Sequence, residues 1–305
     1  MDDPSPHFAD ALIERVRHLG HPLCVGLDPH LERIPEIFLP RPAEPGDPRC
    51  AAAVEDFLNA VVDRLQGRVA LVKPQIALFE QLGWRGLKVL ESVAARARGH
   101  GLIVLLDAKR GDIASSAEGY ARAYLDPRSA LAADALTVNP LLGLDTLDPY
   151  LRHVRESGRG IFVLVRTSNP GAEEFQDRPR EAPLFERLAG ALAEISAGCR
   201  GGRTGWSSLG VVVGANRPEQ AQRVREILPH SLFLVPGFGA QGGGAGDALR
   251  GFVSGPRGRE GGVVNSSRGV LFPAAGESGD AAAWEAAFDS ALEAAVSQLG
   301  EAVSG

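Results

Sequence analysis

The sequence predicts an α/β protein that forms a single (β/α)8 TIM barrel with one extra helix at its N-terminus. Eight short apolar runs recur along the 305 residues and are nearly continuously hydrophobic, as parallel strands covered on both faces are. Segments with helical spacing of apolar residues separate these runs. No GxGxxG motif follows the first run, which disfavours a doubly wound sheet. Alternation of eight strands with helices over about 250 residues therefore indicates the barrel.

The expected elements follow one another along one domain over residues 1–305. A helix from Phe8 to Leu19 lies within the lead-in at 1–22 and is expected to cover the barrel floor. The barrel strands fall within residues 23–272, and a C-terminal helix is expected within 273–305. The eight strands are expected at 23–28, 69–75, 102–109, 135–140, 160–167, 209–215, 232–237 and 262–267.

Helices and long loops are expected between the strands. The apolar faces of two crossover helices are expected at Leu87, Leu90, Ala94 and Ala97, and at Leu184, Leu188, Ala191, Leu192 and Ile195. Polar stretches rich in Gly and Pro predict long loops at 40–49, 168–183, 200–208 and 239–261. Long loops in a compact domain are often functional.

Composition and charge exclude several function classes. Hydrophobic residues make up 44% and charged residues 23% of the chain, and its net charge of -6 gives no broad attraction to nucleic acid or to an anionic membrane. The N-terminal segment has no signal-peptide pattern, and no apolar run is long enough to span a bilayer. The three cysteines form no CxxC pattern, so we expect neither disulfides nor a zinc site, and a reducing cytoplasm fits best.

Charged residues gather at the carboxyl ends of the expected strands, where the active site of such a barrel lies. In LIVLLDAKRGDI, residues 102–113, side chains alternate in direction, so Asp107 and Lys109 share a face. Lys73 on the neighbouring strand is expected close by. This array can stabilise and protonate a carbanion. The alternative is a structural ion pair at the barrel rim, but two lysines on adjacent strands favour a site for an anion.

The last two barrel strands end in segments suited to phosphate. VPGFGAQGGGAG at 235–246, which contains Gln241, can expose backbone N–H groups, and Ser267 and Arg268 follow the final strand. The loops after the last two strands hold phosphate in many barrels. A flexible surface turn is the alternative for the glycine-rich segment. For SGPRGREGG at 254–262, we favour a solvated basic loop over a second anion clamp.

Four motifs at these strand ends resemble one enzyme family. DAKRGDI at 107–113, VKPQ around Lys73, SNPGAEEF at 168–175 and PGFGAQGG at 236–243 are similar to segments of orotidine 5'-phosphate decarboxylases, more closely those of the longer bacterial subgroup, type 2. The resemblance runs from Leu23 to about Phe272. It implies decarboxylation of orotidine 5'-monophosphate (OMP) to uridine 5'-monophosphate (UMP) and CO2, the last step of de novo pyrimidine nucleotide synthesis, with no cofactor and no metal.

The resemblance implies a role for each matching residue. Lys73, Asp107, Lys109 and Asp112 form a charged tetrad, in which Lys109 protonates C6 and Asp107 lies against the substrate carboxylate. Asp112 reaches the site of the neighbouring subunit, so a homodimer is implied. The substrate-binding residues are Asp28 with Lys73 on the ribose, Asp112 with Ser116 on its hydroxyl, Ser168 on the pyrimidine, and Gln241 with Arg268 on the phosphate, beside Ser267.

One departure and two alternatives accompany this hypothesis. Alanine and two serines follow DAKRGDI where shorter family members have Pro-Asn-Thr, and Ser116 lies in this departure. Magnesium-dependent relatives, keto-gulonate phosphate decarboxylase and hexulose phosphate synthase, share the DxKxxD signature but carry an acidic residue in place of Lys73. A silent phosphate-binding barrel has no need for Lys109. The histidines are scattered, and Trp84, Trp206 and Trp284 are expected to pack in helices or loops.

Overall fold

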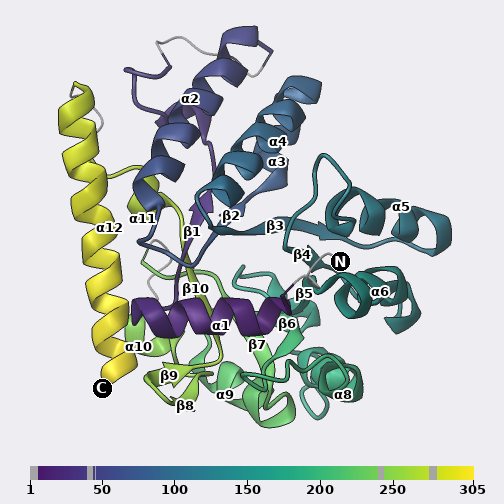
Figure 1. Ribbon diagram of the computed structural model, residues 1–305. Helices are drawn as coiled ribbons and strands as arrows, with labels where there is room; N and C mark the ends of the chain where they lie inside the picture. Colours follow the sequence, from purple (N-terminus) through teal and green to yellow (C-terminus); the bar gives the residue numbers. More distant parts are fainter. Residues whose placement is uncertain (1–5, 40–43, 45, 240–243, 275–279) are drawn as a thin grey trace.

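Eight parallel strands close into a barrel in the computed structural model, which confirms the predicted fold class (Figure 1). Their order around the barrel is β1-β10-β7-β6-β5-β4-β3-β2. The structure describes residues 6–39, 44, 46–239, 244–274 and 280–305. All eight predicted strands are present, with ends within two residues of those expected: β1 Leu23–Leu27, β2 Leu71–Pro74, β3 Ile103–Arg110, β4 Ala135–Val138, β5 Gly160–Arg166, β6 Ser207–Val213, β7 Ser231–Val235 and β10 Gly262–Ser266.

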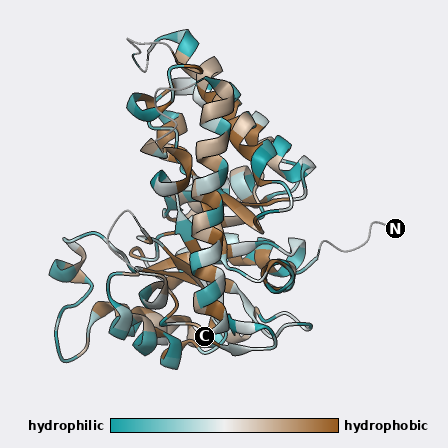
Figure 2. Cartoon of the chain, turned by 90° about the vertical axis from the view of Figure 1, so that its left-hand side faces the viewer, coloured by the Kyte–Doolittle hydropathy of each residue, from teal (hydrophilic) through white to brown (hydrophobic). Residues whose placement is uncertain are grey.

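The strands are apolar throughout because both of their faces are buried. Along β3, Val104 and Leu106 belong to the large cluster between barrel and helices, whereas Ile103 and Leu105 belong to a separate cluster inside the barrel. Figure 2 shows hydrophobic strand residues at the centre and hydrophilic residues on the outer helices and loops. The outer helices are α2 Pro48–Leu65, α3 Ile76–Glu80, α4 Gly83–Gly99, α5 Ala114–Leu125, α6 Asp148–Ser157, α7 Ala172–Phe175, α8 Leu184–Ala197, α9 Pro218–Ile227, α10 Ala245–Ala248, α11 Arg268–Leu271 and α12 Ala281–Ser304.

Helix α1, Phe8–Leu19, covers the barrel floor, as predicted (Figure 1). Its apolar face joins the inner cluster, in which it meets residues from the beginnings of the strands. Phe8 packs edge-on against Phe162 of β5, with ring centroids 5.9 Å apart. Gly160 leaves room for this ring, since a Cβ there would lie 2.3 Å from the Phe8 ring. The floor is therefore sealed by an aromatic contact that a larger residue at position 160 would disrupt.

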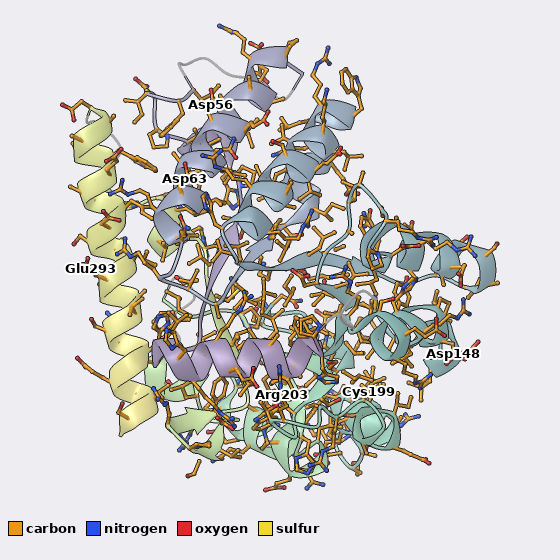
Figure 3. The ribbon with its side chains drawn as sticks, viewed as in Figure 1. Asp56, Asp63, Asp148, Cys199, Arg203 and Glu293 are labelled. Atoms are coloured by element: carbon orange, nitrogen blue, oxygen red, sulfur yellow. The ribbon has the colours of Figure 1, made fainter. Side chains whose placement is uncertain are left out.

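Helix α12 lies along the outside of the barrel next to α2 (Figures 1 and 3). Asp280 caps its start, because the side-chain Oδ1 accepts a hydrogen bond from the backbone N–H of Ala283 at 2.9 Å. Trp284 is buried and packs edge-on against Phe57 of α2, with ring centroids 6.0 Å apart. A row of ion pairs borders this contact: Arg64 with Glu285 at 2.9 Å and with Asp289, Arg68 with Asp289 at 2.5 Å, and Arg68 with Glu293 at 3.4 Å.

The segment at 254–262 differs from the solvated loop that the sequence predicts. It contributes to an antiparallel hairpin, β8 Val253–Gly255 and β9 Gly258–Glu260. Glu260 is buried, pairs with Arg17 of α1 at 2.7 Å and accepts a hydrogen bond from Trp206 Nε1 at 3.0 Å. These contacts tie the hairpin to the barrel floor, far from the strand ends where a phosphate clamp was the alternative.

Two packing predictions were wrong in part. In α8 the buried face contains Phe185, Ala189 and Leu192, whereas Leu184 and Leu188 are half-buried, because the large Phe185 ring takes the core position one residue along. Trp206 and Trp284 are buried as predicted, but Trp84 is 67% exposed at the start of α4. Among the described residues, no helix combines the length and apolarity needed to cross a bilayer.

We expect Phe8→Ala to lower the free energy of unfolding by about 3–5 kcal/mol, because it leaves a cavity between α1 and Phe162. Phe175→Ala is the matched control, since Phe175 is 71% exposed and its loss should cost less than about 0.5 kcal/mol. Urea denaturation followed by circular dichroism measures both. Equal losses in the two variants would contradict the sealing role of α1.

Candidate active site

The carboxyl ends of β2 and β3 bring two lysines and one aspartate into contact. Lys73 Nζ lies 3.0 Å from Asp107 Oδ2, and Lys109 Nζ lies 2.6 Å from Asp107 Oδ1. Ala108 between them points outward into the cluster under the helices, as the alternation along the strand predicts. The three charged side chains line a cavity of about 340 Å³, together with Thr167, Ser168, Asn169, Val212, Leu234, Pro236 and Asn265.

Four hydrogen-bond donors surround the Asp107 carboxylate, two on each oxygen. Oδ1 accepts from Lys109 Nζ and from Thr137 Oγ1, and Oδ2 accepts from Lys73 Nζ and from Gln75 Nε2, at distances between 2.6 and 3.0 Å. Burial disfavours the charged forms of Asp107 and Lys73, but their mutual attraction outweighs it. The pKa of Asp107 therefore lies well below its ordinary value, and the pKa of Lys73 lies above its own. Asp107 stays ionised with its acceptor sites filled.

The backbone of Lys109 adopts a conformation that side chains rarely accept. Its φ of 49° lies in the left-handed region, which costs about 1–2 kcal/mol for a residue with a Cβ. The register between β3 and β4 shifts at this point. Thr137 on β4 stabilises the irregular backbone, because its hydroxyl accepts hydrogen bonds from the N–H groups of Ala108 and Lys109, both at 2.9 Å, and donates to Asp107. All three hydrogen-bonding positions of this hydroxyl are thus used.

Asp28 and Cys24 lie on the β1 side of Lys73. Asp28 follows β1, and its buried Oδ1 has no hydrogen-bond partner among the described residues. Its negative charge helps to raise the pKa of Lys73. Cys24 Sγ lies 3.6 Å from Asn265 Oδ1, and burial raises the pKa of this thiol to about 12. Cys24 is one of three cysteines in the chain, and all three are buried and free.

Ser267 and Arg268 follow β10, which pairs with β1. Gly26 of β1 permits this close approach, because a Cβ at position 26 would lie 1.9 Å from Ser267 Oγ. The Asn265 side-chain amide donates to Ser267 Oγ at 3.1 Å. Arg268 is exposed and has no ion-pair partner within the part of the chain that the structure describes. Gln241, the third residue predicted for this end of the site, lies outside the described residues.

Asp112 and Ser116 do not line the cavity of their own chain. Asp112 Oδ1 accepts a hydrogen bond from the N–H of Ile113 at 2.8 Å, and Ser116 is exposed on α5. Three large apolar side chains lie exposed on the same rim, after β3 and β4: Ile113 is 59%, Leu141 76% and Leu142 55% exposed. An apolar surface with a carboxylate beside it therefore borders the mouth of the barrel.

Four polar side chains of the site were not predicted as site residues from the sequence: Gln75, Thr137, Asn169 and Asn265. Thr137 was assigned to a predicted strand and given no other role, because its β-branched side chain favours strands. A polar residue inside a buried apolar run must find a hydrogen-bond partner, and this rule could have marked both Thr137 and Asn265. Gln75 is the last residue of the VKPQ motif, directly after the strand that carries Lys73, and this position could have identified it as a site residue.

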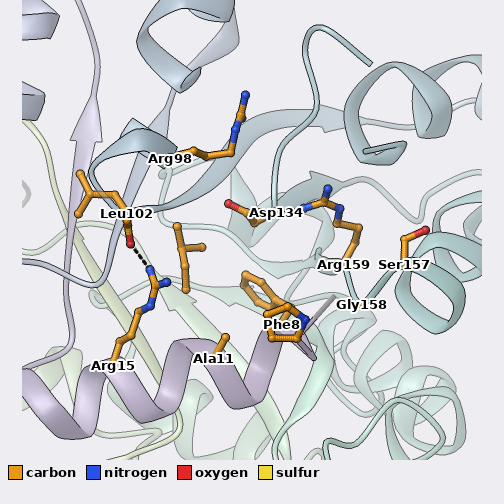
Figure 4. A pocket seen from close by; sticks show the side chains of 12 residues that line it. Phe8, Ala11, Arg15, Arg98, Leu102, Asp134, Ser157, Gly158 and Arg159 are labelled. Atoms are coloured by element: carbon orange, nitrogen blue, oxygen red, sulfur yellow. Dashed lines mark hydrogen bonds and ion pairs between the residues drawn. The ribbon is translucent and has the colours of Figure 1, made fainter. Parts of the chain in front are cut away.

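A second cavity, of about 310 Å³, lies at the opposite end of the barrel between α1 and the beginning of β3 (Figure 4). Three arginines line it, and each donates to an oxygen near the floor: Arg15 to Gly101 O, Arg98 to Ala132 O at 2.6 Å, and Arg159 to Asp134 Oδ1 at 2.8 Å. The residues predicted for catalysis are absent from its lining, so the mouth of the barrel is the candidate site. No described group of three or more His, Cys, Asp or Glu side chains is arranged to hold a metal ion.

Comparison with known proteins gives consistent matches. Residues 21–282 match the sequence model of the "Orotidine 5'-phosphate decarboxylase / HUMPS family". A protein of Rhodopirellula baltica named orotidine 5'-phosphate decarboxylase is 41% identical over 303 residues, which cover 98% of this chain and 99% of that protein. A protein of the same name from Caldicellulosiruptor bescii is 38% identical over 277 residues, covering 87% and 90%. A crystal structure from Streptomyces avermitilis, provisionally described as the same enzyme, aligns with a TM-score of 0.81 at 35% identity, covering 99% and 98%.

We expect Thr137→Val to lower the free energy of unfolding by about 1–3 kcal/mol, because it leaves the buried N–H of Ala108 and the partly buried N–H of Lys109 without an acceptor. Thr137→Ser keeps the hydroxyl and should cost about 1 kcal/mol for the lost methyl group. Urea denaturation of both variants provides the comparison. If valine proves as stable as serine at this position, the hydroxyl does not hold the Lys109 backbone.

Proposed function

The chain belongs to the orotidine 5'-phosphate decarboxylase / HUMPS family, and from this premise we propose that its barrel mouth converts OMP to UMP and CO2, the last step of de novo UMP synthesis. The observation that carries the proposal is the ionised Asp107 held between the ammonium groups of Lys73 and Lys109 at the wall of a cavity. A carboxylate beside a substrate carboxylate raises the energy of the bound substrate, and an ammonium beside the reacting carbon stabilises the charge that develops there.

The reaction requires one bond cleavage and one proton transfer. The bond between C6 and the carboxylate breaks, CO2 leaves, and the electron pair stays on C6. Lys109 gives its proton to C6, and no Schiff base and no metal take part. The Lys109 side chain is 45% exposed, compared with 4% for Lys73 and 10% for Asp107. Lys109 therefore has the freedom to reach the substrate and to regain a proton from solvent.

The remaining polar groups are assigned to the parts of the nucleotide. Asp28, whose buried Oδ1 lacks a partner among the described residues, accepts a hydrogen bond from a ribose hydroxyl beside Lys73. Ser168 contacts the pyrimidine. Arg268 holds the phosphate with Ser267 and Gln241, and this assignment is supported by the absence of an ion-pair partner for Arg268 among the described residues. Binding of the remote phosphate then lowers the barrier at C6.

We also propose a cytoplasmic homodimer in which each chain forms one barrel domain over residues 1–305. The exposed side chains of Ile113, Leu141 and Leu142 support a subunit interface at the rim, since burial of such a patch stabilises association. Asp112 and Ser116, which do not line the cavity of their own chain, contact the ribose in the site of the other subunit. The buried, free cysteines fit a reducing compartment.

The magnesium-dependent members of the family provide the alternative. A magnesium ion needs oxygen ligands with free lone pairs. Both oxygens of Asp107 already accept two hydrogen bonds each, and two of the four donors are ammonium groups that would repel a cation. The donor set of this site therefore favours the metal-free reaction.

We expect the wild-type protein to decarboxylate OMP in EDTA, measured as loss of OMP absorbance, and Lys109→Ala to lower kcat by about 10³-fold or more. Lys88→Ala is the matched control, since Lys88 is an exposed lysine on α4. Inactivity of the wild type in EDTA, with activity on a sugar phosphate after magnesium is restored, would favour the magnesium-dependent relatives. Inactivity under both conditions would favour a silent binding barrel.

A complementation experiment tests the shared site. Lys109→Ala and Asp112→Ala should each be nearly inactive alone, but a hybrid dimer of the two contains one site with both residues intact. After unfolding and refolding of an equimolar mixture, we expect about a quarter of wild-type activity, because random pairing makes half of the dimers hybrids with one good site each. If the mixture stays as inactive as its components, Asp112 does not act across the interface.

A further inference from the structure

We propose that the buried Arg166 and the partly buried Asp177 form a clasp that positions the wall of the cavity made by Thr167, Ser168 and Asn169. The inference rests on the proposed function, in which Ser168 faces the pyrimidine. Neither residue of the clasp lines the cavity, so both are positioning residues rather than catalytic ones. The clasp gives a role to the long loop at 168–183, which the sequence predicts without indicating what holds it.

Arg166 is the last residue of β5 and is 1% exposed. Its guanidinium binds Asp177 through two parallel hydrogen bonds, Nε to Oδ1 at 2.8 Å and Nη2 to Oδ2 at 3.1 Å. The remaining Nη1 donates to the carbonyl of Thr167. One planar group thus joins the strand end, the first residue of the cavity wall and Asp177, which lies two residues after the end of α7. A two-point contact of this kind fixes direction as well as distance.

The backbone of β5 is irregular at the same place. Its register with β6 shifts between Leu164 and Arg166. Irregularities of this kind redirect a side chain next to a functional site. The shift on β5 parallels the one on β3 beside Lys109, so two of the strands whose ends border the cavity leave regular geometry at the barrel mouth.

Further contacts hold the wall from its two sides. Gln176, next to Asp177, accepts a hydrogen bond from the N–H of Thr167 at 2.8 Å and donates to its hydroxyl at 2.9 Å. On the β6 side, the Asn216 amide donates to the carbonyl of Ser168 at 2.9 Å. Gly214 allows this approach, since a Cβ there would lie 3.0 Å from Ser168. Residues 176 and 177 of the loop therefore bind the residues at its start.

The chemistry of the clasp indicates that it sets geometry more than it adds stability. Such an ion pair gains little over a well-packed apolar pair, because the guanidinium loses nearly all of its water and the carboxylate loses most of its own, at side-chain exposures of 2% and 24%. An apolar pair would close the loop without fixing the orientation of Thr167. Removal of the Asp177 charge leaves the buried Arg166 guanidinium without its partner, whereas replacement of both residues avoids that cost. Comparison of single and double variants can therefore separate the effect of the pair on the geometry of the cavity wall from its effect on the stability of the fold.

The clasp acts on one end of the site only. The wall at Thr167 to Asn169 follows β5, whereas Ser267 and Arg268 follow β10, and β6 and β7 lie between these strands in the barrel. Loosening of the wall should weaken contacts to the pyrimidine and leave the phosphate contacts intact. The product UMP and inorganic phosphate are therefore suitable probes, because phosphate binds only at the unaffected end.

The experiment compares wild type with Asp177→Asn, Arg166→Lys and the double variant Arg166→Met with Asp177→Leu. We expect each to lower kcat/KM for OMP by about 10- to 100-fold and to raise the inhibition constant of UMP by a similar factor. The inhibition constant of inorganic phosphate should change by less than about twofold. Lysine at position 166 should not rescue activity, because an ammonium lacks the paired N–H groups. The double variant should fold stably and still show the defect.

The matched control is Glu173→Gln, on the same loop. Glu173 pairs with Arg217 at the surface, where loss of an ion pair has little effect. We expect its kinetics to equal those of the wild type. Hydrogen exchange over residues 167–177 should accelerate in Asp177→Asn but not in Glu173→Gln, and this readout needs no substrate.

Three outcomes would overturn the clasp. Unchanged kcat/KM in folded variants with a lower melting temperature would make it a stabilising pair only. Equal rises in the inhibition constants of UMP and phosphate would indicate a general distortion of the barrel mouth. Unchanged hydrogen exchange in Asp177→Asn would show that the pair does not hold the wall. Inactivity of the wild type toward OMP would instead contradict the proposed function, and hydrogen exchange would still decide whether the clasp holds the segment.

Discussion

The rest of the site depends on one constraint: the Asp107 carboxylate must stay ionised and fixed while buried at the end of an apolar strand. Lys73 and Lys109 supply the opposite charge, and Thr137 and Gln75 complete its hydrogen bonds. Such an arrangement is costly to assemble, since each charge loses water. The barrel provides it because neighbouring parallel strands place their carboxyl ends at one rim, and because α1 seals the other end.

Irregular backbone at the barrel mouth is the second requirement. Lys109 adopts a left-handed conformation, and the registers of β3 and β5 both shift near their ends. Regular alternation places every second side chain of a strand on the face toward the cavity, and an irregularity at the strand end changes the direction of the last side chains. Local strain at functional positions is tolerated when the surrounding structure over-determines it. Here the Thr137 hydroxyl and the clasp of Arg166 with Asp177 provide that support.

Much of this architecture could be predicted from the sequence, because buried parallel strands are apolar on both faces and leave a continuous pattern. The contact of Asp107 with Lys109 followed from strand alternation, and that with Lys73 followed from its place on the neighbouring strand. The hydrogen-bond partners of Asp107 could not be predicted in this way. Threonine favours strands whether or not its hydroxyl binds a neighbour, and no spacing rule links position 137 to position 107. The choice between lysine and arginine also points to the site: among the 32 Lys and Arg residues, the only lysines are Lys73, Lys88 and Lys109. Two of these three lysines line the cavity, in a chain that otherwise uses arginine for its positive charge.

The burial of all three cysteines also matters for anyone who wishes to follow this protein spectroscopically. Cys24, Cys50 and Cys199 are free but buried, and the pKa of the Cys24 thiol is raised to about 12, so none of them offers a reactive thiolate at the surface. A cysteine introduced on an exposed residue of the loop, such as Phe175, would be the one thiol open to a maleimide dye or a spin label. The wild-type chain thus already has the thiol-free surface that labelling studies usually have to create by mutation.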